Sequence, residues 1–218
     1  MLNHGLTATL SSGIRFFRLR LHQKDEKPTT AESLGAPPSD RAVNSRMSPA
    51  GISLFYGAMD QRTARAETFR LAPGNMPEYG TIACWTSTRS ILVLDLTKHL
   101  ESPSFYAADE SYLYDEAGFL YGFIADITQP IERDGREHIE YVPSQIVTEY
   151  FRTGFSLPTG ERLDGVLYPS ARKKYGKCVA LFVGNQQLNP TYGFETAPPI
   201  ALDSTSIRRT FARPRRHT

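Results

Sequence analysis

Three side chains that could act on one small molecule lie within a short stretch of this chain. Arg46, Tyr56 and Glu67 supply a cation, an aromatic ring and a carboxylate, ten and eleven residues apart. The planar guanidinium of arginine suits phosphate oxygens, and an ionised carboxylate can stabilise a developing positive charge. The spacing alone leaves a plainer interpretation open, in which the arginine and glutamate are solvated surface charges and the tyrosine packs at the edge of the core.

The elements around these residues decide where each one sits. Arg46 falls in a long polar loop, residues 23–50, which contains four prolines and is expected to lack regular structure. Tyr56 ends a short strand predicted over residues 52–56. Glu67 lies near the second turn of a helix for which Asp60 is a suitable N-cap.

The remaining pattern predicts an α+β fold in a single domain. Residues 14–21 alternate as a strand does, with Arg18 and Arg20 on one face and apolar side chains on the other. An apolar stripe of Ile146, Val147, Tyr150 and Phe151 favours a helix over residues 141–151. Further strands are expected at residues 81–85, 91–96, 165–168 and 178–183, and a helix at residues 105–127.

The domain predicted from these elements covers residues 14–184, between an N-terminal extension (1–13) and a C-terminal tail (185–218). The last eleven residues hold five arginines and no acid. Such an end could contact nucleic acid or anionic lipid, but a solvated, mobile end is the more common case. The tail is therefore not assigned a partner of its own.

Composition excludes several classes of protein. Hydrophobic residues make up 40% of the chain, which is enough for a core and too much for a disordered protein. Cys84 and Cys178 are expected to be buried free thiols, and the five histidines are widely scattered, so no metal site is predicted. With no signal peptide or membrane-spanning segment in the pattern, we expect a soluble cytoplasmic protein. A P-loop, a dinucleotide-binding glycine motif and a nucleophile elbow are all missing from the sequence.

Six short motifs, taken in order, resemble those of the RES-domain family. Members of that family are commonly the toxin half of bacterial toxin–antitoxin pairs. The resemblance extends over residues 14–183. It rests on FFRLR (16–20), LGAPP (34–38), SRMSPAGISLFYGAMD (45–60), ETF (67–69), YVPSQIVTEYF (141–151) and GVLYPSAR (165–172).

The resemblance implies a mixed or antiparallel sheet core like that of ADP-ribosyltransferases, with surrounding helices, and a chemistry that consumes NAD+ as substrate. It places the catalytic residues at Glu67, Arg46 and Tyr56. The substrate-binding residues fall at Arg18, with Arg20 as the alternative, and at Ser170. Met47 departs from the pattern, since relatives usually carry an aromatic residue there, and the departure concerns the packing of the loop.

The implied reaction breaks the bond between nicotinamide and ribose. Nicotinamide leaves as a neutral base, so no acid is needed; the site must stabilise an oxocarbenium-like ribose, and Glu67 is suited to that. The arginines would hold the two phosphates, Tyr56 would face the nicotinamide ring, and Ser170 would bind an amide or ribose oxygen. Gln145 and Glu149, one helical turn apart, are either a further polar contact or a surface pair.

The acceptor of ADP-ribose stays open at this point: water or phosphate in an NAD+-degrading toxin, or a protein in an ADP-ribosyltransferase. A non-catalytic interaction protein is the alternative from another class. The toxin interpretation implies a helix-turn-helix (Xre-type) antitoxin as partner, nucleic acid bound only through that antitoxin, a possible homo-oligomer, and no membrane association.

Overall fold

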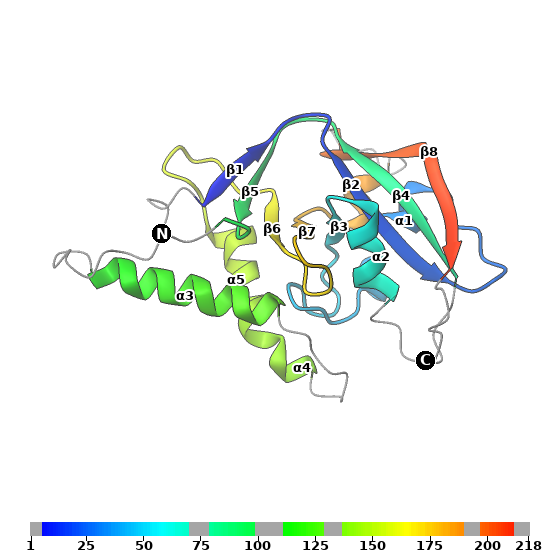
Figure 1. Ribbon diagram of the computed structural model, residues 1–218. Helices are drawn as coiled ribbons and strands as arrows, with labels where there is room; N and C mark the ends of the chain where they lie inside the picture. Colours follow the sequence, from blue (N-terminus) through cyan, green and yellow to red (C-terminus); the bar gives the residue numbers. More distant parts are fainter. Residues whose placement is uncertain (1–5, 70–78, 99–110, 129–136, 190–196, 212–218) are drawn as a thin grey trace.

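An eight-stranded mixed sheet organises the part of the chain that the computed structural model describes, residues 6–69, 79–98, 111–128, 137–189 and 197–211 (Figure 1). Its strand order is β1-β5-β6-β7-β3-β2-β4-β8, and every pair is antiparallel except β5 with β6. The strands are β1 (Thr7–Leu10), β2 (Arg15–His22), β3 (Phe55–Ala58), β4 (Tyr79–Ser87), β5 (Ile91–Asp95), β6 (Gly165–Pro169), β7 (Lys177–Leu181) and β8 (Ile200–Phe211). The α+β class predicted from the sequence is confirmed.

Helices lie on both sides of this sheet. They are α1 (Ala31–Leu34), α2 (Gln61–Phe69), α3 (Ser111–Thr128), α4 (Glu137–Glu140), α5 (Val142–Glu149) and α6 (Asn185–Leu188), with a 3₁₀ turn at Ser39–Arg41 and a π turn at Tyr150–Gly154. The proline-rich loop is thus not without structure, because Thr30 and Ser33 form a capping box that starts α1.

The alternation of β2 divides the core between the two faces of the sheet. Phe16 packs with Phe55 and Trp85 in one cluster, where the rings of Phe55 and Trp85 meet edge to face at 5.3 Å. Leu34 of α1 and Leu188 of α6 belong to the same cluster. On the other face, Leu19 packs with apolar residues of β3, α2 and β7. Because period-two alternation sorts side chains in this way, the predicted strand over residues 14–21 forms nearly as expected.

Helix α2 follows β3 directly and lies over β2 and β3 (Figure 1). Asp60 caps its N-terminus, accepting a 3.0 Å hydrogen bond from the backbone N–H of Thr63, as the sequence predicted. Thr63 and Ala64 are buried against the sheet. This packing fixes the direction in which Glu67, one turn further along, leaves the helix.

The face of α5 that is buried differs from the prediction. Ile146 and Tyr150 of the expected apolar stripe are 64% and 50% exposed, although Phe151 is buried. The prediction that this stripe forms the packed face of the helix is therefore wrong. The side chains that α5 buries are polar: Ser144, Gln145 and Thr148. Helix α3 contributes Phe123 and Ile127 to the cluster that contains Phe151. Residues 105–110 of the helix predicted there lie outside the described residues.

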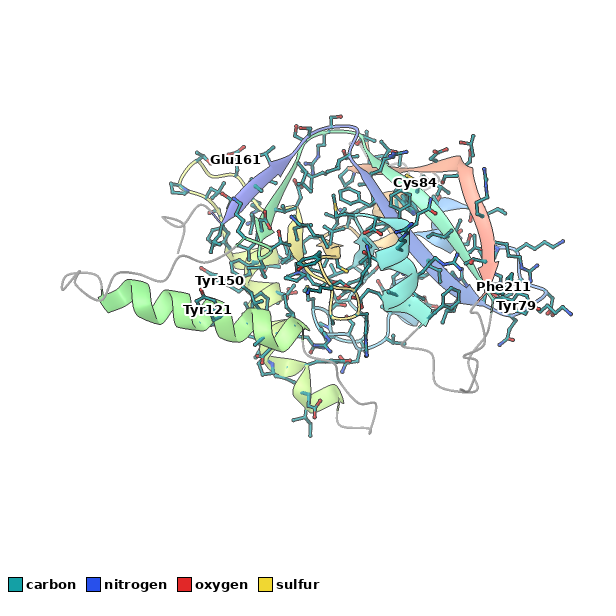
Figure 2. The ribbon with its side chains drawn as sticks, viewed as in Figure 1. Tyr79, Cys84, Tyr121, Tyr150, Glu161 and Phe211 are labelled. Atoms are coloured by element: carbon teal, nitrogen blue, oxygen red, sulfur yellow. The ribbon has the colours of Figure 1, made fainter. Side chains whose placement is uncertain are left out.

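Both ends of the described chain add an edge strand to the sheet. β1 pairs with β5, and β8 pairs with β4 as far as Tyr79 and Phe211, which Figure 2 shows at adjoining strand ends. Arg208 and Arg209 of the basic end therefore belong to a strand, while residues 212–218 are outside the described ranges. The predicted domain boundaries stay a prediction.

Candidate functional site

A cavity of about 450 Å³ collects side chains from β2, the loop before β3, β3 itself, α2, and the β6–β7 region. Arg18, Arg46, Tyr56 and Glu67 all line it. Its volume is within the range of about 300–1,000 Å³ that is usual for small-molecule sites. Side chains as far apart in the sequence as Phe17 and Cys178 are therefore gathered around one cavity.

The carboxylate of Glu67 is held in place by a hydrogen bond from Ser170. Its Oε1 accepts a 2.5 Å hydrogen bond from Ser170 Oγ and a weaker contact from Cys178 Sγ at 3.8 Å. Ser170 Oγ in turn accepts hydrogen bonds from the backbone N–H groups of Arg172 and Lys173. Since the serine hydroxyl has one proton and gives it to Glu67, Ser170 orients the carboxylate. Ser170 itself is not among the residues that line the cavity.

The turn that carries Ser170 is tied to the start of α2. Lys173 Nζ donates to both carboxylate oxygens of Asp60, at 3.0 and 3.1 Å, and to Thr63 Oγ1. Although partial burial opposes ionisation, the hydrogen bonds from Thr63 and Lys173 lower the pKa of Asp60 to about 2. Gly176 lets the turn approach closely, because a Cβ there would lie 2.8 Å from Thr63 Oγ1. Glu67 and Ser170 are thereby fixed relative to each other.

Arg18 bridges the place where β2 and β3 separate. These strands pair at Phe17 and Ala58, and beyond that point Arg18 Nη1 donates to the carbonyl oxygen of Tyr56 at 2.7 Å. Its guanidinium carbon lies 5.7 Å from the centre of the Phe55 ring. Burial lowers the pKa of Arg18 to about 10. Its buried Nε has no hydrogen-bond partner in the described part of the chain, and no carboxylate there pairs with it.

Arg20, the alternative to Arg18, lies elsewhere. It donates to the carbonyl of Ser33 and forms a long ion pair with Glu26, at 3.8 Å. Arg20 is not among the residues that line the cavity. The structure therefore separates the two arginines that the sequence left as alternatives, and it places Arg18 at the cavity.

Helix α5 holds the loop that carries Arg46. Gln145 Nε2 donates to Asn44 Oδ1 and to the carbonyl oxygen of Ser45, both at 2.7 Å, and Ser144 Oγ donates to the carbonyl oxygen of Arg46 at 2.5 Å. The Arg46 guanidinium donates to the carbonyl oxygen of Asp126 on α3, at 2.6 Å. Ser144 and Gln145 are polar side chains on the buried side of α5. Polar residues at such positions are the sequence signal that could have indicated that this helix holds the Arg46 loop.

Gln145 is thus a buried anchor of the loop. Glu149, which the sequence paired with it, points elsewhere and binds Arg152, with its carboxylate 2.6 Å from the guanidinium. Met47, the departure from the RES pattern, is 3% exposed and packs in the cluster with Phe151. The loop is therefore packed without the aromatic residue usual at that position.

Tyr56 lines the cavity with its ring and holds the Arg46 loop with its hydroxyl. Its hydroxyl makes hydrogen bonds to Ser45 Oγ at 2.7 Å and Ser48 Oγ at 3.0 Å, so it fastens the same loop that Gln145 holds. Burial raises the pKa of its phenol. Its ring lines the cavity.

The charges at the cavity are mainly positive. Arg172 lines it together with Arg18 and Arg46, and Glu67 is the acidic residue among the described lining side chains. Burial lowers the pKa of Arg46, and the nearby Arg172 lowers it further, while Glu67 acts in the opposite direction. An anionic ligand would relieve the repulsion between the guanidinium groups. Sequence reasoning did not select Arg172 or Tyr168, which also lines the cavity.

A comparison with protein-family models matches the RES domain over residues 15–191. The chain belongs to the RES domain family. The resemblance seen in the six motifs is confirmed, and membership supports an NAD+-related, toxin-type enzymatic function; RES proteins are generally associated with antitoxin partners. A search of curated proteins found no match to the chain.

In the described ranges, no three or more His, Cys, Asp or Glu side chains converge in a way that could hold a metal ion. Among the helices of those same ranges, none has the length and apolar character that crossing a bilayer would require.

Proposed function

We propose that this RES protein cleaves the nicotinamide–ribose bond of NAD+ and transfers ADP-ribose to water or to phosphate. The observation that carries the proposal is the position of Glu67: its carboxylate is held by Ser170 in a cavity that also contains Arg18 and Arg46. A fixed carboxylate among cations suits a substrate that is anionic at its diphosphate and becomes cationic at its ribose.

In the proposed reaction the bond between ribose C1′ and the pyridinium nitrogen breaks, and its electron pair stays on the nitrogen. Nicotinamide leaves as a neutral molecule, while Glu67 stabilises the oxocarbenium-like ribose. An oxygen of water then forms the new bond to C1′ and releases a proton to the solvent, or an unprotonated oxygen of phosphate forms that bond with no proton to lose. Orientation of Glu67 by Ser170 before the substrate binds lowers the cost of reaching this arrangement.

The other residues at the cavity would bind the rest of the substrate or position the residues that do. Arg18 and Arg46 would bind the diphosphate, since the planar guanidinium is a strong, charged donor to phosphate oxygens. The Nε of Arg18, which has no hydrogen-bond partner among the described residues, supports this assignment. The ring of Tyr56 would pack on the nicotinamide, while its hydroxyl keeps the Arg46 loop in place. Ser170 acts through Glu67, which changes the direct substrate contact expected of it from the sequence.

The test is incubation of the purified protein with labelled NAD+, alone, with phosphate, and with cell extract. Free ADP-ribose, an ADP-ribose phosphate or a labelled protein band would distinguish water, phosphate and a protein target as acceptor, and the last would favour the ADP-ribosyltransferase alternative. Glu67→Gln should abolish the loss of NAD+ and keep the fold, because the amide oxygen can still accept from Ser170. Glu161→Gln is the matched control, on an exposed loop that Figure 2 shows apart from α2.

If wild-type protein leaves NAD+ intact and NAD+ does not raise its unfolding temperature, the proposal is refuted, and a non-catalytic interaction protein becomes the better description. A bound small molecule stabilises the folded state in proportion to its affinity, so the thermal measurement does not depend on turnover.

For partners, we propose an Xre-type helix-turn-helix antitoxin that covers the cavity, with nucleic acid bound only through it and a homo-oligomer as the assembled toxin. The cytoplasm, which contains both NAD+ and DNA, is the proposed location. Co-expression with the product of the neighbouring gene, followed by copurification and an NAD+ assay, tests this. A neighbouring product that neither binds nor inhibits the RES protein would contradict the antitoxin proposal.

A further inference from the structure

Three tyrosines line the cavity, Tyr56, Tyr141 and Tyr168, and the hydroxyls of Tyr56 and Tyr168 differ in what they do. The hydroxyl of Tyr56 is fully engaged by Ser45 and Ser48. The hydroxyl of Tyr168 makes no hydrogen bond to any group in the described part of the chain. A polar group in a largely apolar setting normally has a partner, so an unused hydroxyl at a cavity is available to a ligand.

The ring of Tyr168 is held firmly. Tyr168 lies on β6, which pairs with β5 on one side and β7 on the other. The ring packs against the cluster that contains Phe151 and also against the cluster that contains Leu19. A hydroxyl on a ring fixed from two sides has little freedom left to lose when it binds a ligand.

The neighbours of Tyr168 indicate which part of a ligand would reach it. Burial raises the pKa of Tyr168 well above its ordinary value, and the nearby Cys178, Tyr56 and Glu67 act in the same direction, while Arg46 opposes them. The phenol therefore stays protonated at neutral pH and can donate a hydrogen bond. Tyr168 is also the register partner of Cys178 on β7, whose Sγ lies 3.8 Å from Glu67 Oε1, so Tyr168 lines the cavity on the side where the proposed reaction takes place.

We infer that Tyr168 is a substrate-contacting residue whose hydroxyl donates a hydrogen bond to an oxygen of the nicotinamide riboside half of NAD+. The inference rests on the proposed function and adds to it a residue that the sequence did not single out. It also separates Tyr168 from Tyr56: Tyr168 contacts the substrate with its hydroxyl, whereas Tyr56 uses its hydroxyl to hold the loop.

The test compares Tyr168→Phe and Tyr56→Phe in NAD+ cleavage and in urea unfolding. Tyr168→Phe should lower kcat/KM by about three- to tenfold, the effect of one lost hydrogen bond, and leave the unfolding midpoint unchanged because no protein partner is lost. Tyr56→Phe should lower the unfolding midpoint, because two protein hydrogen bonds disappear.

Cleavage of nicotinamide mononucleotide tests which half of NAD+ Tyr168 contacts, since this molecule contains the nicotinamide riboside and lacks the adenylate. The loss caused by Tyr168→Phe should be the same fold-change with this substrate as with NAD+, relative to wild type in each case. A smaller loss with the mononucleotide would overturn the assignment to that half.

Different results would overturn the assignment of Tyr168 and the proposed function. If wild-type protein cleaves NAD+ and Tyr168→Phe does so with unchanged kcat/KM, the inference about Tyr168 is overturned and the proposed function stands. If wild-type protein neither cleaves nor binds NAD+, the proposed function fails and the inference falls with it.

Discussion

Replacing Gln145 with methionine tests whether α5 controls the position of Arg46. Methionine has nearly the length of glutamine and no hydrogen-bond donor, so the change removes the bonds to Asn44 Oδ1 and the Ser45 carbonyl with little change in volume. Gln145 is 8% exposed, and water therefore has limited access to the acceptors that lose their partner. Two short bonds, each 2.7 Å long, are lost together.

The expected magnitudes follow from these contacts. A lost hydrogen bond costs about 0.5–1.5 kcal/mol, and a buried acceptor left unpaired costs about 1–3 kcal/mol. Because both acceptors lie on a half-buried loop, we expect the free energy of unfolding to fall by about 2 kcal/mol. If the loop then releases Arg46 from the diphosphate, a charged hydrogen bond of about 1.5–3 kcal/mol is lost, which is about 10- to 100-fold in kcat/KM.

Urea unfolding gives the first quantity, and initial rates over a range of NAD+ concentrations give the second. The loss should appear mainly in KM, since Arg46 is proposed to bind the diphosphate in the ground state as well as in the transition state. Glu149→Gln, one turn along the same helix, is the matched control: its exposed ion pair with Arg152 should contribute less than about 1 kcal/mol and nothing to KM. A Gln145→Met protein that is destabilised by 2 kcal/mol as expected but has wild-type kcat/KM would refute the coupling.

Two further predictions use other contacts of the site. Arg18→Met should raise the KM for NAD+ by about 10- to 100-fold, whereas Arg20→Met, outside the cavity, should leave KM unchanged; equal effects in the steady-state assay would contradict the placement of Arg18 at the diphosphate. The pKa of Asp60 falls from 3.8 to about 2 on folding, so its contacts with Thr63 and Lys173 stabilise the protein above about pH 4, and this stabilisation is lost as the pH falls towards 2. Thermal unfolding from pH 5 to pH 2 should therefore show a shallower loss of stability in Asp60→Asn than in wild type, and parallel curves would contradict this origin.

Much of the fold could be predicted from local pattern. The alternation in β2, the cap at Asp60 and the buried strand predicted at residues 91–96 are local signals, and each corresponds to an element that forms. The edge strand β8 was missed because its residues are largely polar, and an edge strand with one solvated side needs little apolar surface. The stripe on α5 was misplaced because periodicity shows that a helix has an apolar face and not that the fold buries that face.

The sequence by itself determined the family and the residue types of the site, because the motifs around Arg18, Arg46, Tyr56 and Glu67 are short and continuous along the chain. Only the tertiary structure decided between Arg18 and Arg20, placed Ser170 behind Glu67, and set Gln145 under the Arg46 loop. The physical reason is that these choices depend on hydrogen bonds between segments as much as 103 residues apart, and one-dimensional spacing does not encode which buried donor meets which acceptor.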